Sequence, residues 1–207
     1  MNDIEQIFTN IYDQNLWGKG SGPGSRAKGT EDYRKVLTDL LMENDVNSVL
    51  DYGCGDWQFS HLIEWPKYVT SYTGVDIVKS VIDTNIELHS NNVIRFEHCT
   101  NSYLFPDVDL IVCKDVLQHL SNKTISALLK KFVKHSKYIF ITNDSNHYKK
   151  IVKNSDIQDG KWRPLDLSLA PWNIKSKTIY ECQIKKKGHT KTGVLIISDT
   201  LKNQNLP

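Results

Sequence analysis

The sequence lacks the features that would mark a membrane-spanning, disulfide-bonded or zinc-binding protein. Its four cysteines are far apart in 207 residues and form no Cys-x-x-Cys pair, so we expect free thiols and no metal site. No apolar run approaches the ~20 residues that cross a bilayer. No basic and apolar leader opens the chain, so we expect a cytoplasmic protein without a membrane partner.

An excess of charge of one sign is also missing. The chain has 26 Lys and Arg against 24 Asp and Glu, a formal net charge of +2. This balance argues against a nucleic-acid partner, although it is compatible with a local basic face. The lysines at Lys149-Lys150-Lys153 and Lys185 to Lys187 are interpreted as solvated faces or as phosphate-binding patches. With 39% hydrophobic residues, the composition fits one globular domain over residues 1–207.

One stretch organises the chain, Val49-Leu50-Asp51-Tyr52-Gly53-Cys54-Gly55-Asp56-Trp57-Gln58-Phe59. It predicts a strand, a tight turn and a helix that begins near Asp56. Glycines allow a close approach of a ligand, and a helix N-terminus presents free N–H groups. Taken alone, a Gly-x-Gly turn is as compatible with a plain loop as with a nucleotide-type cofactor site.

A second apolar strand strengthens the cofactor interpretation. Tyr72-Thr73-Gly74-Val75-Asp76 ends in an acid about 25 residues after Asp51, which is close to the spacing of the ribose-binding carboxylate in dinucleotide folds. Apolar patterns predict further strands and helices in alternation. We expect helices over 3–16, 30–43, 56–63 and 80–89 and after Ser121, and strands over 46–51, 72–76, 93–99, 109–112, 138–142, 179–184 and 193–198. This order is typical of an α/β fold, with a mostly parallel sheet, helices on both faces and an antiparallel strand near the C-terminus.

The motifs Asp51 to Gly55, Gly74-Val75-Asp76 and Asp109 to Leu120 resemble those of class I S-adenosylmethionine-dependent methyltransferases. A closer resemblance is to small bacterial methyltransferases, uncharacterised or related to capsule and polysaccharide modification. It is carried by Trp17-Gly18, Ser21-Gly22-Pro23-Gly24-Ser25, the Gly-Cys-Gly-Asp-Trp turn, and Asn154, Asp156, Gly160, Trp162 and Arg163.

The resemblance spans roughly residues 11 to 198 and implies a Rossmann-like fold with a seven-stranded sheet and S-adenosylmethionine as cofactor. It also implies one domain in three parts. Residues 1–45 supply the N-terminal helices and a glycine-rich lid, residues 46–144 the cofactor-binding core, and residues 145–207 a substrate-side insertion and the closing strands.

The resemblance further implies a set of cofactor-binding residues. Asp76 would accept the ribose hydroxyls, Ile77 would pack on adenine, and Asp51 would orient the turn or reach the methionine ammonium through water. Gly22 to Ser25 would offer backbone donors to the methionine carboxylate. The full set is Trp17, Ser25, Asp51, Gly53, Gly55, Asp56, Trp57, Asp76, Ile77, Thr100, Asn101, Lys114 and Asp115.

The chain departs from the family pattern at two of these places. Thr100 and Asn101 stand where many members carry an acid that binds the adenine amine. Trp57 stands where a third glycine is common, so we expect its indole to form a wall of the pocket.

Methyl transfer from a sulfonium is a direct displacement, so positioning supplies much of the rate and few catalytic groups are obligatory. His119 is the candidate base, because imidazole titrates near working pH; the alternative is a helix-capping or core histidine. The predicted substrate-binding residues are His119, Asn143, Asp144, Trp162 and Arg163. For Trp162 and Arg163, loop anchoring is an equal alternative.

We therefore expect a methyltransferase that acts on an oxygen or nitrogen of a small polar acceptor, for which sugar- and phosphate-bearing molecules are candidates. The alternatives are a non-catalytic binding protein of the same fold and a nucleic-acid methyltransferase. A nicotinamide-dependent oxidoreductase is a further alternative, but its Gly-x-Gly-x-x-Gly turn would need glycine at position 58, which is Gln. The sequence does not indicate an oligomeric state.

Overall fold

A computed structural model of the chain describes residues 3–145, 153–184 and 189–201. Lys149, Lys150 and Lys185 to Lys187, which were interpreted as parts of basic clusters, lie outside these ranges. Within the described ranges no helix is long and apolar enough to span a bilayer.

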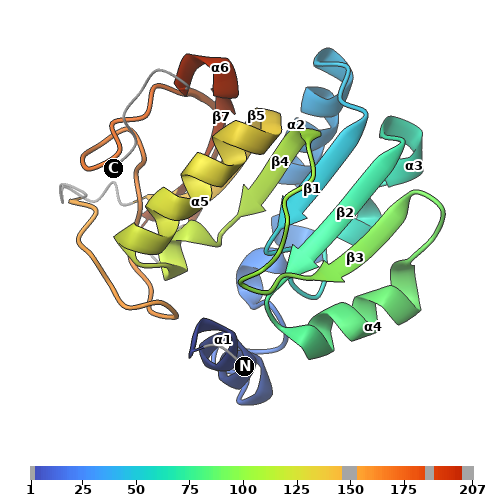
Figure 1. The fold of residues 1–207 in the computed structure, drawn as a ribbon, viewed down its shortest axis with the longest axis horizontal. Helices are drawn as coiled ribbons and strands as arrows, with labels where there is room; N and C mark the ends of the chain where they lie inside the picture. Colours follow the sequence, from blue (N-terminus) through green and yellow to red (C-terminus); the bar gives the residue numbers. More distant parts are fainter. Residues whose placement is uncertain (1–2, 146–152, 185–188, 202–207) are drawn as a thin grey trace. The chain divides into compact units, whose positions relative to one another are not determined.

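The strands form a seven-stranded mixed sheet with the order β3-β2-β1-β4-β5-β7-β6 (Figure 1). β1, β2 and β3 are parallel, whereas β7 is antiparallel to both β5 and β6, which confirms the predicted Rossmann-like sheet with an antiparallel strand near the C-terminus. The strands are β1 (Ser48–Tyr52), β2 (Ser71–Asp76), β3 (Ile94–His98), β4 (Val108–Lys114), β5 (Ser136–Ser145), β6 (Lys177–Ile184) and β7 (His189–Ile197).

The chain divides into two compact units, Met1–Asp109 and Leu110–Pro207, which we call the N-terminal and C-terminal units and describe separately. In the N-terminal unit, α4 packs on β2 and β3. The apolar face of α2 buries Tyr33, Leu37, Leu40 and Leu41. The helices of this unit are α1 (Asp3–Asp13), α2 (Glu31–Glu43), α3 (Trp65–Tyr68) and α4 (Lys79–His89), with 3-10 turns η1 (Pro23–Ser25), η2 (Ala27–Gly29) and η3 (Ser60–Leu62).

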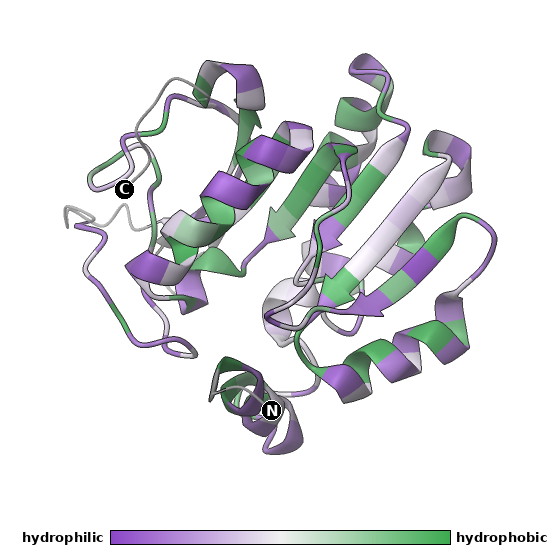
Figure 2. Cartoon of the chain, in the orientation of Figure 1, coloured by the Kyte–Doolittle hydropathy of each residue, from purple (hydrophilic) through white to green (hydrophobic). Residues whose placement is uncertain are grey.

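The C-terminal unit contains η4 (Leu117–His119), α5 (Asn122–His135) and α6 (Ser198–Leu201). Ser121 caps α5 as predicted, because its side chain accepts a hydrogen bond from Thr124 N at 3.3 Å. Figure 2 shows hydrophilic and hydrophobic colours alternating along α5, consistent with one apolar face. That face buries Ile125, Leu128, Leu129, Phe132 and Val133. Residues 153–176 are neither helix nor strand, as expected, whereas α6 was not predicted.

The helix predicted over 56–63 is wrong. Trp57 has a φ of 56°, a left-handed conformation that a right-handed helix cannot contain, and only Ser60–Leu62 forms a 3-10 turn. Pro66 lies in the first turn of α3. Thr30 precedes α2 as expected, but its hydroxyl donates to the carbonyls of Arg26 and Ala27 at 3.1 Å instead of capping the helix.

A buried hydrogen-bond relay fixes the segment after the glycine turn. Trp57 Nε1 donates to Tyr72 Oη at 2.7 Å, and Tyr72 Oη donates to Asp51 Oδ2 at 2.6 Å. The indole is 3% exposed and packs on the rings of His89 and Phe96, with centroids 4.8 and 5.1 Å away. These contacts correct the expectation that Trp57 forms a wall of a ligand pocket, because its side chain is part of the core.

Substitution of Tyr72 tests this relay. We expect Tyr72→Phe to lower the free energy of unfolding by about 2–4 kcal/mol, because it leaves two buried polar groups, Trp57 Nε1 and Asp51 Oδ2, without the shared hydroxyl. Urea denaturation would measure the change. Tyr68→Phe is the matched control, since Tyr68 is half-buried and has no such relay, and we expect a change within about 0.5 kcal/mol. Equal effects of the two variants would contradict the relay.

Candidate functional site

The glycine turn of the N-terminal unit follows β1 directly. Gly53 and Gly55 have φ values of 75° and 56°, in the left-handed region that favours glycine. The N–H groups of Gly53 and Cys54 both donate to the carbonyl of Val75 in β2, at 2.8 and 3.0 Å. A Cβ on Gly55 would lie 2.2 Å from Ser21 Oγ. The turn therefore needs glycine at position 55 for conformation and for space.

Asp76 ends β2 and is 8% exposed. Its Oδ2 accepts from Gly55 N at 3.0 Å and its Oδ1 from Val78 N at 2.9 Å. Burial raises the pKa of this carboxyl group, and the backbone donors oppose that rise. The carboxylate thus ties the end of one parallel strand to the glycine turn after the neighbouring strand.

The glycine-rich loop before α2 is attached to the same turn. Ser21 N and Oγ donate to Asp56 Oδ2 and Oδ1 at 3.1 and 2.6 Å, and Asp56 N donates to Ser21 Oγ at 3.0 Å. Tyr12 Oη lies 2.8 Å from Ser21 Oγ. We call Tyr12, Ser21 and Asp56 the loop latch. Sequence reasoning named Asp56 for the cofactor site but gave Ser21 and Tyr12 no role, because their contacts join segments far apart in the chain.

Other residues predicted for the cofactor site are also in the N-terminal unit. Trp17 packs against Phe8 and Tyr12 with ring centroids 5.9 Å away in each case. Ser25 and Ile77 are half-buried, and Thr100 and Asn101, which follow β3, are exposed. Asp51 is 5% exposed and is engaged by Tyr72, as described above, which favours its structural role over contact with a ligand.

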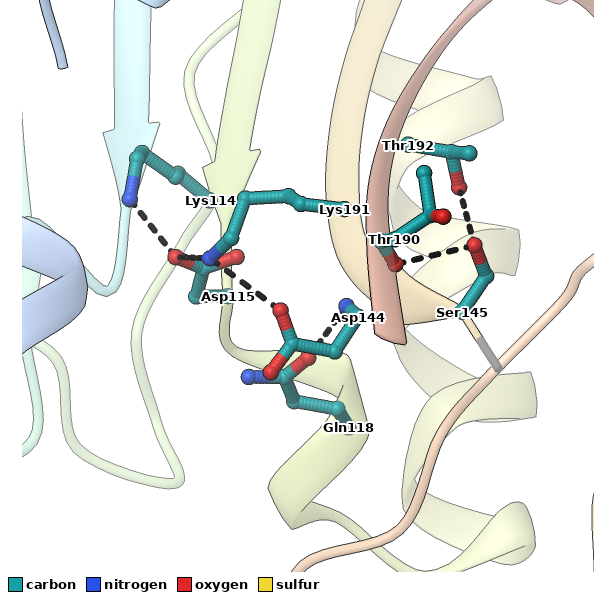
Figure 3. Close-up of polar contacts among 8 residues, drawn as sticks. All are labelled: Lys114, Asp115, Gln118, Asp144, Ser145, Thr190, Lys191 and Thr192. Atoms are coloured by element: carbon teal, nitrogen blue, oxygen red, sulfur yellow. Dashed lines mark hydrogen bonds and ion pairs between the residues drawn. The ribbon is translucent and has the colours of Figure 1, made fainter. Parts of the chain in front are cut away.

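The C-terminal unit contains a separate buried cluster of charges (Figure 3). Lys114 Nζ donates to Asp115 Oδ2 at 2.6 Å. Lys191 Nζ pairs with the same oxygen and lies 3.4 Å from Asp144 Oδ1. The side chains of Lys114, Lys191 and Asp144 are 5%, 9% and 8% exposed, and that of Asp115 is 16% exposed. We call these four residues the charge cluster.

The charges in this cluster depend on one another. Burial alone would raise the pKa of Asp115, but Lys114 and Lys191 outweigh it and lower that pKa to about 2. Burial disfavours the ammonium of Lys191, but Asp115 and Asp144 outweigh it and raise its pKa. The pKa of Lys114 is lowered by burial, against the attraction of Asp115. Asp115 is therefore held as a carboxylate throughout the neutral range.

Lys191 was missed by sequence reasoning. The last strand was expected to begin at Gly193, so Lys191 was assigned no buried position. In the structure β7 begins at His189, and Lys191 pairs with Asp144 of β5 across the antiparallel ladder. The alternation Thr190, Lys191, Thr192 was the available signal, but it does not say which face is buried.

His119 ends η4 at the edge of the same unit. Its Nδ1 lies 3.1 Å from the carbonyl oxygen of Lys161, and since a carbonyl only accepts, Nδ1 carries the proton. A neutral imidazole in this tautomer has its lone pair on Nε2. Burial lowers the pKa of His119, while the negative charges of Asp115 and Asp144 oppose that shift. The preceding residue, Gln118, accepts from Asp144 N at 2.6 Å.

Arg163 anchors the loop around it. It is 6% exposed, and its guanidinium donates to the carbonyls of Ser155 and Leu117 and to Asn122 Oδ1, at 3.1, 3.2 and 2.8 Å. These contacts favour the loop-anchoring alternative, because all three guanidinium nitrogens donate to protein acceptors. The neighbouring Trp162 is 46% exposed.

Asn143 lies inside β5 and not after it as expected, and it is 4% exposed. Successive side chains of a strand point to opposite faces, so Asn143 faces away from Asp144 and Lys191. The structure therefore brings Lys114, Asp115 and Asp144 together and leaves Asn143 and Arg163 apart from them.

Comparisons with known proteins agree with the fold. No curated protein matches the chain. Solved structures do match, including magnesium protoporphyrin IX methyltransferase (ChlM) from Synechocystis PCC 6803 with bound S-adenosylhomocysteine, at 14% identity and a TM-score of 0.63, covering 93% of this chain and 99% of that one. The methyltransferase domain of bacterial CtHen1 matches at 17% identity and a TM-score of 0.57, covering 80% and 96%. The N-terminal domain of EvdMO1 matches at 12% identity and a TM-score of 0.59, covering 95% and 97%.

A sequence profile described as a methyltransferase domain matches residues 26–170. The matched segment includes the glycine turn, Asp76 and His119. The match to a methyltransferase profile does not support the alternative of a nicotinamide-dependent oxidoreductase, which the glycine turn had left open. Because the match covers more than half of the 207 residues, the chain belongs to the methyltransferase-domain family and is an S-adenosylmethionine-dependent methyltransferase.

Proposed function

We propose that the protein transfers the methyl group to an oxygen or nitrogen of a small polar molecule, and that the glycine turn and Asp76 hold the donor. The observation that carries the donor site is the buried carboxylate of Asp76, which is tied to the turn through Gly55 N. In open α/β sheets ligands bind beyond the carboxyl ends of the strands, where Asp76 is located. The near-neutral charge of the chain supports a small molecule over a nucleic acid as acceptor.

The residues around Asp76 fit an adenosyl group. The carboxylate of Asp76 receives backbone N–H groups from Gly55, Val78 and Ile77, and because a carboxylate has about four acceptor positions, a ribose hydroxyl can use a remaining one. Ile77 comes next in the chain and offers apolar contact to adenine, while Thr100 or Asn101, just beyond β3, offers polar contact to its edge. Gly53 and Gly55 allow backbone close to the ligand. Bound S-adenosylmethionine supplies an electrophilic methyl group on a sulfonium.

The loop latch supports a lid role for the glycine-rich loop. Ser21 holds this loop on Asp56, one residue after Gly55, and Trp17 anchors the loop to α1 through Phe8 and Tyr12. The backbone donors expected of Gly22 to Ser25 are mostly engaged within the loop, since Gly22 N donates to the carbonyl of Lys19 at 3.3 Å, Ser25 N donates to the carbonyl of Gly22 at 3.2 Å, and proline has no N–H. This arrangement would exclude water from the donor.

His119 is proposed as the base for a protonated acceptor. Its tautomer, fixed by the carbonyl of Lys161, places the accepting lone pair on Nε2. Its lowered pKa keeps the imidazole neutral, and thus able to accept a proton, at neutral pH. The helix-capping alternative is disfavoured, because Ser121 caps α5.

Removal of the Asp76 charge tests the donor site. We expect Asp76→Asn to weaken binding of S-adenosylhomocysteine by about 10- to 100-fold, since hydrogen bonds to a charged group contribute about 1.5–3 kcal/mol. Isothermal titration calorimetry would measure the dissociation constant, and circular dichroism would establish folding. The matched control is Asp83→Asn, which removes an exposed pair with Lys79 and should bind like the wild type. An Asp76→Asn affinity within about twofold of the wild type would contradict the site.

The role of His119 can be tested through its titration. We expect its imidazole to titrate below the ordinary value of about 6.5, followed by NMR, with the signal assigned by its loss in His119→Gln. The rate should rise with pH through this pKa as the imidazole loses its proton, and then level off. His119→Gln should lose this dependence and about 10²- to 10⁴-fold in kcat. An unchanged pH profile for formation of S-adenosylhomocysteine would show that His119 is not the base.

A further inference from the structure

The charge cluster of the C-terminal unit has no role in the donor site described above, although it is costly to bury. Two lysines and two aspartates converge from β4, β5 and β7 and from the residue that follows β4 (Figure 3). Asp115 and Asp144 lie at the carboxyl ends of β4 and β5, where open α/β sheets bind ligands. Buried ionic groups contribute little net stability, so their presence here favours a binding role.

The formal charges of the cluster sum to zero, because two ammonium groups face two carboxylates. Both lysines converge on a single oxygen, Asp115 Oδ2, and Lys191 is shared with Asp144. An incoming phosphate or carboxylate would therefore find both ammonium groups already neutralised. Its desolvation would remain uncompensated, which costs several kcal/mol for a buried ion.

Two buried polar atoms in and beside the cluster, in contrast, have no hydrogen-bond partner within the described ranges. Among the residues that the structure describes, Asp115 Oδ1 is buried and accepts no hydrogen bond. Thr142 Oγ1, on the same face of β5 as Asp144, is likewise buried without a partner, and Thr142 is 0% exposed. A buried polar atom left unpaired costs about 1–3 kcal/mol, which a donor from a ligand would recover.

The backbone at Asp115 adds a second sign of function. Its φ is 61°, a left-handed conformation that costs a non-glycine residue about 1–3 kcal/mol and is concentrated at functional sites. The neighbouring ladder maintains it, since Asp115 N donates to the carbonyl of Thr142 at 2.8 Å. The two lysines then fix the direction of the carboxylate, so Oδ1 is presented in one orientation.

We propose that the charge cluster is the acceptor-binding site and that it selects an uncharged, hydroxyl-bearing molecule, whose hydroxyl donates to Asp115 Oδ1. The cluster selects against phosphorylated and carboxylated acceptors. This inference rests on the proposed function and narrows its acceptor to neutral hydroxyl compounds. It also assigns Lys114 and Asp115 to the acceptor and not to the cofactor, and it adds Lys191 as a positioning residue for Asp115.

Labelling of the transferred methyl group reveals the charge of the product even when the acceptor is a mixture of compounds. The full chain is incubated with S-adenosylmethionine, tritium-labelled in its methyl group, and the small-molecule fraction of a bacterial cell extract. The products then pass over a cation exchanger, which removes unused donor, and an anion exchanger. We expect the protein-dependent label to pass through both columns. Protein-dependent label retained on the anion exchanger, or no protein-dependent label in the neutral fraction, would overturn the proposal.

Asp115→Asn should convert the cluster into an anion site, because two lysines then face one carboxylate. Inorganic phosphate at millimolar concentration should raise the Tm of Asp115→Asn by a few degrees relative to chloride at equal ionic strength, and leave the wild type unchanged. Asp39→Asn, which removes an exposed partner of Lys35, is the matched control and should behave like the wild type. Equal stabilisation of wild type and Asp115→Asn by phosphate would overturn the proposal.

A second variant covers the case in which Asp115→Asn does not fold. Lys191→Met leaves one lysine facing two carboxylates, so it should reduce the neutral labelled product at least about tenfold and give no stabilisation by phosphate. Undiminished neutral product from Lys191→Met would overturn the assignment of Lys191. Titration of the wild type with S-adenosylhomocysteine separates the proposed donor site from the proposed acceptor site. No binding of S-adenosylhomocysteine would contradict the donor site, whereas binding together with a charged methylated product would contradict only the acceptor site.

Discussion

The hydrogen bond between the Asp76 carboxylate and Gly55 N is the constraint on which the N-terminal unit depends. It requires the end of β2 to lie beside the turn after β1, which parallel pairing of these strands provides. It also requires a backbone at Gly55 that a side chain would obstruct, because Ser21 occupies that space. The glycine turn, the parallel strands and the loop latch are therefore parts of one arrangement.

Two buried carboxyl groups in this protein show how neighbouring charges set the direction of a pKa shift. Asp76 has only backbone donors, so burial dominates and its pKa is raised. Asp115 has two ammonium neighbours, which overcome burial and lower its pKa to about 2. The first arrangement ties the carboxylate to the backbone of the glycine turn. The second holds a carboxylate in one orientation, in a cluster whose formal charge is zero.

Much of the fold was predictable because strands and helices leave local patterns. The apolar runs that end in Asp51 and Asp76, and the repeat from Ile125 to Val133, located their elements within a few residues. The absence of a helix after the glycine turn was not predictable from the sequence. It depends on the left-handed backbone of Trp57, whose side chain contacts Tyr72 and Phe96 in the core. A pattern of residue types does not contain that contact.

The sequence alone determined the strand-turn-strand cofactor motif, with its glycines and its strand-end aspartate, because each of these features depends on residues close together in the chain. Only the tertiary structure decided which polar side chains serve the core and which form a site. Trp57 and Arg163 had the chemistry of ligand contacts, yet their donors are used inside the protein. Lys191 had the chemistry of a surface residue, yet antiparallel pairing of β7 with β5 places it between two carboxylates. Such assignments depend on neighbours distant in sequence, and folding alone brings those neighbours together.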